Sequence, residues 1–212
     1  MSSLKVEQDT GEADPGLLNL LISKHEGFEK QVFNKLTSAR LIGGLVAKKE
    51  EHVEMMQVNF VSNDGRLGMP VFTSVGELNK WNIEARPLPL SAKDFAQQTI
   101  SQKLDGLIID LSASHRFVIS GYMLDCLANE RSWDFPHEDQ QVKEVITSIC
   151  QTNPKVGKID IEKGTKCDLT ITIHGPASLA NGVIKLANLI SEHPVIREKV
   201  PRGADLFLKP SL

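Results

Sequence analysis

Residues 63–81, NDGRLGMPVFTSVGELNKW, encode a turn, a strand and a helix start in succession, and they decide how the surrounding chain folds. Gly65 tolerates a positive φ, so the residues around it predict a hairpin turn. The turn would join a strand at 53–61, VEMMQVNFV, to a returning strand at 67–73, LGMPVFT. Pro70 lacks a backbone N–H, which favours a sheet edge or a position whose donor side is unpaired.

A helix is predicted directly after this strand. Ser74 and Glu77 have the spacing of a capping box, in which the serine side chain accepts from the N–H three residues on. The helix should then run through Trp81. Folding alone therefore explains much of the opening stretch.

The chain on either side alternates between helical and strand patterns, which predicts an α/β fold of mixed α+β character. Helices are expected at 17–21, 29–36, 92–104 and 122–129, and strands at 39–47, 86–90, 107–109 and 116–120. The segment ERSWDFPHEDQ at 130–140 contains few aliphatic residues and marks a domain boundary. We expect a disordered tail at 1–15, a mixed-sheet α/β domain at 16–137 and a smaller α-β-β-α-β domain at 138–212.

The composition excludes several functional classes. With 41% hydrophobic and 24% charged residues, the chain of 212 residues resembles an ordinary globular protein. A net charge of −3 and 5% aromatic residues argue against direct binding to nucleic acid. No apolar run approaches the roughly 20 residues of a membrane span, and the N-terminus has no hydrophobic signal core. We therefore expect a cytoplasmic protein that makes no membrane contact.

No cofactor or metal is expected. The three cysteines form no CxxC motif, and the six histidines never have the i, i+4 spacing of a zinc-binding helix. Gly43-Gly44 lacks the lysine and the spacing of a phosphate-binding loop.

Several motifs occur in an order that resembles the SseB family, the relatives of enhanced serine sensitivity protein B. They are ARLIGGLVA at 39–47, DGRLGMPVFTS at 64–74, Trp81 followed by ARPLPL at 85–90, DGLIIDL at 105–111 and SWDFPHED at 132–139. The chain looks most like the two-domain actinobacterial members, whose second domain is similar to CDLTITIHGPAS at 167–178 and HPVIREKVPRGADLFL at 193–208. The resemblance implies an SseB N-terminal domain of mixed-sheet type, followed by the smaller domain.

The resemblance implies no established reaction. It suggests a non-enzymatic cytoplasmic protein that acts as a binding, regulatory or adaptor module, linked to amino-acid (serine) sensitivity or to a translation context. The partner would be another protein or a small anionic or amino-acid ligand. The second domain would supply a further partner contact or a surface for a homo-oligomer, because open sheets pair along exposed edges.

Five residues form the expected recognition surface: Asp64, Arg66, Ser74, Trp81 and Arg86. The guanidinium of Arg66 is a planar fork suited to a carboxylate or phosphate, and Ser74 at the helix start could hold the same anion. Each residue also has a purely structural interpretation. Asp64 and Arg66 would then form a turn with a paired surface arginine, Ser74 a helix cap, and Trp81 with Arg86 a packed corner.

The alternative function is a hydrolase or transferase. Asp110 follows a buried strand and His115 begins the next, a pairing that could orient an imidazole as a base beside Thr73 and Ser74. Side chains more than about 10 Å apart cannot reach one another through a single water. We expect such a separation, with Asp110 and His115 joined only by a hydrogen bond that closes their turn.

Overall fold

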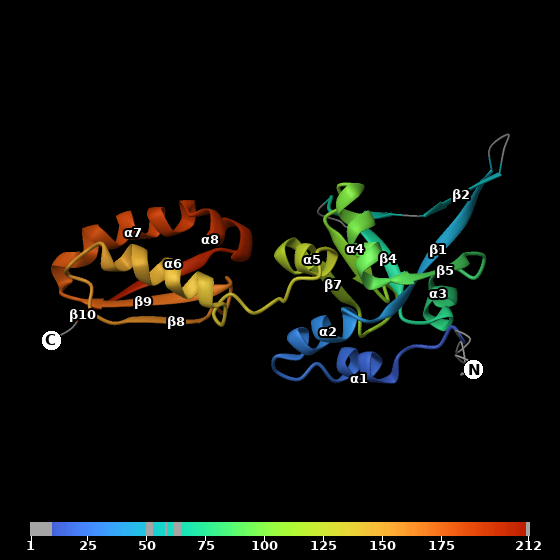
Figure 1. Ribbon diagram of the computed structural model, residues 1–212, viewed down its shortest axis with the longest axis horizontal. Helices are drawn as coiled ribbons and strands as arrows, with labels where there is room; N and C mark the ends of the chain where they lie inside the picture. The colour runs from blue at the N-terminus through green and yellow to red at the C-terminus, as the bar shows by residue number, and fades with distance from the viewer. Residues whose placement is uncertain (1–9, 50–52, 58, 62–64, 211–212) are drawn as a thin grey trace, which may run out of the picture. The chain divides into compact units, whose positions relative to one another are not determined.

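The chain folds into two compact units, Met1–Trp133 and Asp134–Leu212, here called unit 1 and unit 2. The computed structural model describes residues 10–49, 53–57, 59–61 and 65–210 (Figure 1). Both units combine helices with a β-sheet, so the mixed α/β fold class is confirmed. None of the described helices has the length and apolar character required to cross a membrane.

Unit 1 is built on one mixed sheet. Its helices are α1 (Pro15–Ser23), α2 (Phe28–Leu36), α3 (Val75–Trp81), α4 (Ala92–Ser101) and α5 (Gly121–Ala128). Its strands are β1 (Arg40–Lys49), β2 (Val53–Gln57), β3 (Phe60–Val61), β4 (Leu67–Phe72), β5 (Arg86–Ser91), β6 (Gly106–Ile109) and β7 (Phe117–Ser120). The sheet has the order β2-β1-β4-β6-β7, with β5 paired to β1 and β3 paired to β4. Because β4 and β6 are parallel, their carboxyl ends lie at the same end of the sheet.

The strand expected at 53–61 is divided into β2 and β3. The turn residues 62–64 of the expected hairpin lie outside the described residues.

Alternation along the strands separates two hydrophobic clusters on opposite faces of the sheet. On one face, Leu41 and Val71 belong to the large core that is covered by α1, α2, α4 and α5. On the other face, Ile42 and Phe72 pack against Leu78 of α3. α3 therefore lies on the face opposite the other helices of unit 1.

Gly44 allows α3 to approach the sheet. A Cβ atom at this position would lie 2.9 Å from Cζ3 of Trp81 and 3.0 Å from Cδ1 of Leu78. Close packing of α3 on this face of the sheet therefore requires glycine at position 44 of β1.

Pro70 lies in the interior of the sheet, so the edge position expected as one alternative is wrong. β3 pairs with Leu67 and Gly68, whereas β1 pairs with Val71 and Phe72. Pro70 falls between these two ladders, where its missing N–H leaves no partner unsatisfied.

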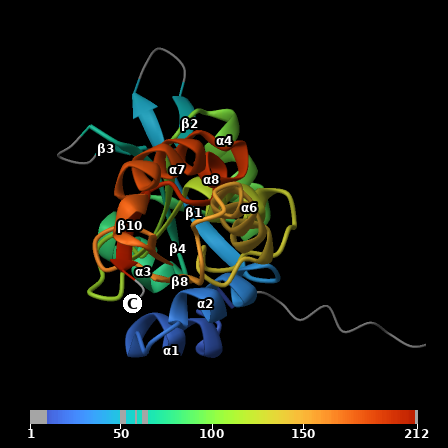
Figure 2. The same cartoon turned by 90° about the vertical axis from the view of Figure 1, so that its left-hand side faces the viewer.

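Unit 2 has the expected α-β-β-α-β order with two additions, a short 3-10 helix and one further α-helix. The elements are α6 (Gln140–Gln151), β8 (Ile159–Lys163), β9 (Leu169–Gly175), the 3-10 helix η1 (Ala177–Leu179), α7 (Ala180–Glu192), α8 (Pro194–Lys199) and β10 (Ala204–Pro210). β9 is central, antiparallel to β8 and parallel to β10. Figure 2 shows α6, α7 and α8 gathered over this sheet, where Ile146, Ile171 and Ile190 share one core.

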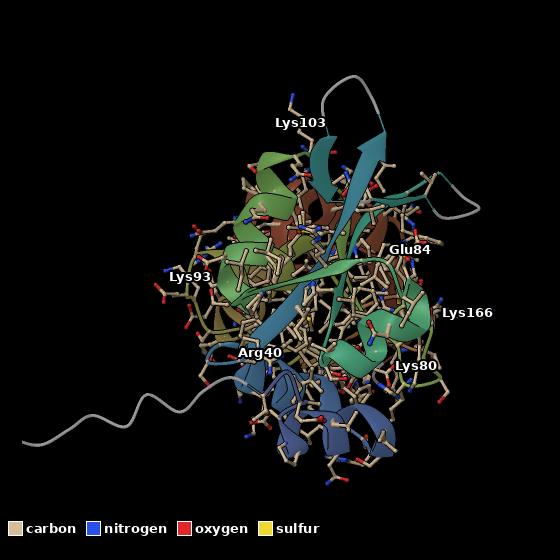
Figure 3. The ribbon with its side chains drawn as sticks, turned by 90° about the vertical axis from the view of Figure 1, so that its right-hand side faces the viewer. Arg40, Lys80, Glu84, Lys93, Lys103 and Lys166 are labelled. Atoms are coloured by element: carbon tan, nitrogen blue, oxygen red, sulfur yellow. The ribbon has the colours of Figure 1, made fainter. Side chains whose placement is uncertain are left out.

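The expected disorder of the tail at 1–15 is wrong for its second part, while residues 1–9 lie outside the described residues. The carbonyl of Gly11 accepts from the first N–H of α3 at 2.9 Å. The carbonyl of Glu12 accepts from the guanidinium of Arg40, at the start of β1, at 2.7 Å (Figure 3). The acidic composition of this segment suggested disorder, but its backbone bonds to two elements of unit 1.

Asp14 continues this ordered segment as the N-cap of α1. Its Oδ1 accepts from the Leu17 N–H at 2.8 Å, and Pro15 occupies the first helical position. The backbone hydrogen bond from Leu17 lowers the pKa of Asp14 below its ordinary value.

We expect Gly44→Val to lower the stability of unit 1 by about 1–3 kcal/mol, because the added atoms overlap Trp81 and Leu78. Urea unfolding measures the effect. Gly76→Ala in α3 is the control, since its Cβ would meet nothing closer than Ser74 Oγ at 3.5 Å. Alanine should stabilise that helix by up to about 1 kcal/mol. Equal effects of the two substitutions would contradict the packing role of Gly44.

We expect Asp14→Ala to cost about 1 kcal/mol at pH 7 through loss of the cap. The folded pKa of Asp14 is below the unfolded value, so its contribution is fully present above the unfolded pKa. The difference between wild type and variant should shrink as the pH falls through the folded pKa. Urea unfolding between pH 7 and pH 3 tests this, and a difference that grows toward low pH would contradict it.

Candidate functional site

Two of the expected recognition residues lie too far apart to share a small ligand. Arg66 is exposed just before β4, and Ser74 follows its other end, where Ser74 Oγ accepts from the Glu77 N–H at 3.1 Å. Eight residues of extended chain span about 26 Å. Asp64 lies outside the described residues. Ser74 is therefore a helix cap, and one small anion does not reach both Ser74 and Arg66.

Trp81 and Arg86 also lie in separate environments. Trp81 is half-buried and its ring centroid lies 5.5 Å from that of Phe72, which places it in the cluster under α3. Arg86 is exposed at the start of β5, which pairs with β1 and not with β4. Among the described side chains, no cation–π contact joins Arg86 to Trp81. The packing of Trp81 is accordingly structural.

Arg66 lines a groove of about 360 Å³ on the sheet. This groove, here called the β7 groove, is bounded by residues of β4, β6 and β7 and by the segments before β4 and β6: Arg66, Leu67, Gly68, Asp105, Gly106, Ile108, Val118 and Ser120.

The pairing register explains why this part of the sheet is hollow. Gly68, Gly106 and Ser120 lie opposite one another across β4, β6 and β7, so the row contains little side-chain volume. A Cβ at Gly68 would lie 2.5 Å from Cδ1 of Ile108, and a Cβ at Gly106 would lie 2.6 Å from the carbonyl oxygen of Ile119. The Ile108 side chain therefore packs over Gly68, and the two glycines together with Ile108 form the floor of the β7 groove.

The next row and the neighbouring strand make the walls apolar. Pro70, Ile108 and Val118 lie opposite one another, and the Val118 side chain is 50% exposed. Phe60 on β3 pairs with Gly68 and is 37% exposed. Because β4 alternates, this face is also the face that carries Phe72 and α3. α3 covers its Phe72 end and leaves the glycine row open.

Two charged residues line the β7 groove, Asp105 and Arg66. The Asp105 carboxylate accepts from the Leu67 N–H at 2.7 Å, so it holds β4 beside β6. β7 ends the sheet, and no described strand pairs with its outer edge.

A second cluster lies where β4 and β6 end. Asp110 is fully buried and accepts from the Thr73 N–H and from Thr73 Oγ1, both at 2.8 Å. His115 Nε2 lies 3.0 Å from Asp110 Oδ2, the oxygen that also accepts from Thr73 Oγ1. The expected separation of more than about 10 Å is therefore wrong for these three residues. Parallel pairing brings Thr73, after β4, beside Asp110, after β6.

The hydrogen bonds in this cluster do not activate the Thr73 hydroxyl as a nucleophile. A nucleophile is activated when its hydroxyl donates to a basic imidazole, which a third group then orients. Here the carboxylate lies between the hydroxyl and the imidazole, and Thr73 Oγ1 donates to Asp110. The hydrogen bond between Asp110 and His115 closes their turn as expected, and Asp110 adopts a left-handed φ of 50°.

Glu77 extends the cluster from the first turn of α3. Its Oε1 pairs with Lys80 Nζ at 2.6 Å, and Figure 3 labels Lys80 on this helix. The hydrogen bond that Lys80 donates to Glu77, then the charge of Glu77 and more weakly that of Asp110, raises the pKa of Lys80. Glu77 Oε2 is buried and has no hydrogen-bond partner among the described residues. The sequence identified Glu77 only as part of a capping box, and no sequence signal connects it with Asp110.

The SseB protein N-terminal domain family matches residues 19–125, which contain both the β7 groove and the Asp110 cluster. No curated protein and no solved structure matches the chain.

We expect Thr73→Val to destabilise unit 1 by about 1–3 kcal/mol, because the buried Asp110 carboxylate loses one of its donors. Thr99→Val is the matched control. Thr99 is equally buried, but its hydroxyl donates to the Phe95 carbonyl within α4, so its loss should cost about 1 kcal/mol or less. Urea unfolding compares them, and a smaller effect at Thr73 than at Thr99 would contradict a stabilising role for this bond.

Proposed function

The chain belongs to the SseB family, and from that premise we propose that unit 1 is a non-enzymatic recognition module. Its ligand is an extended segment of a partner protein, bound along β7 with its side chains over the β7 groove. The observation that supports this best is the outer edge of β7, with which no strand in the described part of the chain pairs, beside an apolar hollow.

The backbone of β7 provides the first part of the recognition. An extended peptide can pair with an exposed strand edge, where main-chain hydrogen bonds supply affinity. Alternate side chains of such a peptide project to one face of the extended sheet. On the face that carries Val118, these side chains would lie beside the floor of the β7 groove.

The surface chemistry favours a protein segment over a small anion. Val118, Phe60 and Leu67 are 50%, 37% and 38% exposed around the β7 groove. A small polar metabolite would leave these side chains in water, whereas apolar peptide side chains would cover them. Arg66 suits one acidic side chain of the segment, because a guanidinium binds a carboxylate through two parallel hydrogen bonds.

The hydrolase or transferase alternative has weaker support. Thr73 is 2% exposed and donates to a carboxylate, so it lacks both access to a substrate and an imidazole base. A role as a cytoplasmic regulator or adaptor fits a recognition module, and serine sensitivity or a translation context would then depend on the protein that supplies the segment. Unit 2 would contribute a further partner contact or self-association.

We expect peptides selected from a displayed random 12-residue library against the full chain to alternate apolar residues and to include Asp or Glu. Val118→Glu should weaken their binding at least tenfold, because it places a charge in the apolar wall. Arg66→Ala should weaken it about five- to twentyfold through loss of the carboxylate contact. Fluorescence anisotropy with the selected peptides measures both effects.

Ile83→Glu is the matched control for the library experiment. Ile83 is 75% exposed in the turn after α3 and does not line the β7 groove. Peptide binding should be unchanged in this variant. A thermal-shift screen with serine and anionic metabolites covers the small-ligand possibility. A stabilising metabolite whose effect requires Arg66 but not Val118, or peptides insensitive to Val118→Glu, would overturn the proposal.

A further inference from the structure

We propose that Glu77, Asp110 and His115 form a binding site for a divalent metal ion, with Zn²⁺ as the best fit. Each residue offers one ligand atom, and the three atoms lie within 4.8 Å of one another. The residues come from α3, from the end of β6 and from the turn before β7. The site therefore depends on tertiary structure, which is why the spacing of histidines along the chain does not reveal it.

The unpartnered oxygen of Glu77 is an independent indication of a cation. The Glu77 side chain is only 12% exposed, and its Oε2 is buried with no hydrogen-bond partner among the described residues. A buried carboxylate oxygen without a partner is costly. Lys80 pairs with the other oxygen, Oε1, and leaves Oε2 available. A metal ion bound among the three residues would satisfy it.

The charge of the cluster also favours a cation. Two carboxylates, those of Glu77 and Asp110, face the single ammonium group of Lys80. The Lys80 side chain is 65% exposed, so it projects largely into solvent. The buried part of the cluster therefore keeps an excess of negative charge when the imidazole is neutral.

Asp110 is already held in a fixed orientation. The N–H and the hydroxyl of Thr73 donate to its two oxygens, each at 2.8 Å. Hydrogen bonds to a metal-binding carboxylate orient it and commonly determine the affinity of the site. The hydrogen bonds from Thr73 would thus orient the Asp110 carboxylate toward the ion, as hydrogen bonds to the ligands do in known metal sites.

The ligand types favour Zn²⁺ over Mg²⁺ or Ca²⁺. Zinc binds both imidazole nitrogen and carboxylate oxygen, and three such protein ligands leave a fourth tetrahedral position for water. Mg²⁺ and Ca²⁺ prefer six or more oxygen ligands. Tetrahedral bonds of about 2.1 Å bring ligand atoms to about 3.4 Å from one another. His115 Nε2 now lies 3.0 Å from Asp110 Oδ2, within hydrogen-bond distance. To bind the ion, Nε2 would give up its proton, with the neutral ring carrying its hydrogen on Nδ1, so that the Nε2 lone pair faces the metal.

The test is calorimetric titration of the EDTA-treated full chain with ZnCl₂ at pH 7. We expect one ion per chain with a dissociation constant in the micromolar range or below, and no comparable heat with MgCl₂. Glu77→Gln and His115→Asn should each weaken zinc binding at least tenfold. A zinc-dependent rise in the thermal unfolding midpoint should be lost in the same two variants.

His174→Asn is the matched control. His174 Nε2 lies 2.7 Å from Asp160 Oδ2 in unit 2, so this pair repeats the contact between an imidazole and a carboxylate, and no third ligand joins it among the described residues. This variant should bind zinc as the wild type does. Unfolding midpoints without zinc identify any variant that fails to fold. If His115→Asn fails to fold, the nearly isosteric Glu77→Gln alone tests whether the cluster binds zinc.

The proposal is overturned if the wild type binds no zinc, or if Glu77→Gln retains wild-type affinity. It is also overturned if His174→Asn abolishes the binding, since the ion would then lie in unit 2. The peptide-binding proposal for the β7 groove makes no use of the ion, so each can fail without the other.

Discussion

The parallel pairing of β4 with β6 is the constraint on which both sites of unit 1 depend. It sets Gly68 opposite Gly106, which produces the floor of the β7 groove. It also carries Thr73 and Asp110 to the same end of the sheet, where they bond. Ligand sites in α/β sheets gather at the carboxyl ends of strands for this reason. One short ladder thus determines a hollow at one end and a polar cluster at the other.

The Asp110 cluster shows how much structure one buried carboxylate can organise. A buried charge is tolerated only when donors surround it, and Asp110 has the backbone and hydroxyl of Thr73 together with the imidazole of His115. These contacts connect the ends of β4 and β6 with the turn that leads to β7. Asp110 adopts a left-handed φ. In this conformation the backbone turns away after β6 while the carboxylate keeps its hydrogen bonds to Thr73 at the end of β4. Glu77 alone in this cluster keeps an unsatisfied oxygen, which makes it the informative residue.

The sequence predicted what depends on neighbouring residues and missed what depends on strand pairing. The cap at Ser74 was predictable because acceptor and donor are three residues apart. Arg66 was identified by its side-chain chemistry, but its position at a groove required the register of β6 and β7. The contact between Thr73 and Asp110 spans 37 residues, and no local pattern encodes it. The expectation that these residues would be distant was wrong because neither the sequence around Thr73 nor the sequence around Asp110 indicates which strands are neighbours in the sheet.

Glycines on the face of the sheet that carries α3 have different effects at its two ends. Gly44 lets α3 pack closely, so Trp81 and Leu78 cover the Phe72 end of the face. Gly68 and Gly106 instead reduce the side-chain volume at the other end, and no described helix covers that end. An uncovered sheet face of Leu or Val would expose a large apolar patch. A floor with little side-chain volume reduces that exposed area, and with it the risk of aggregation, while the β7 groove stays open.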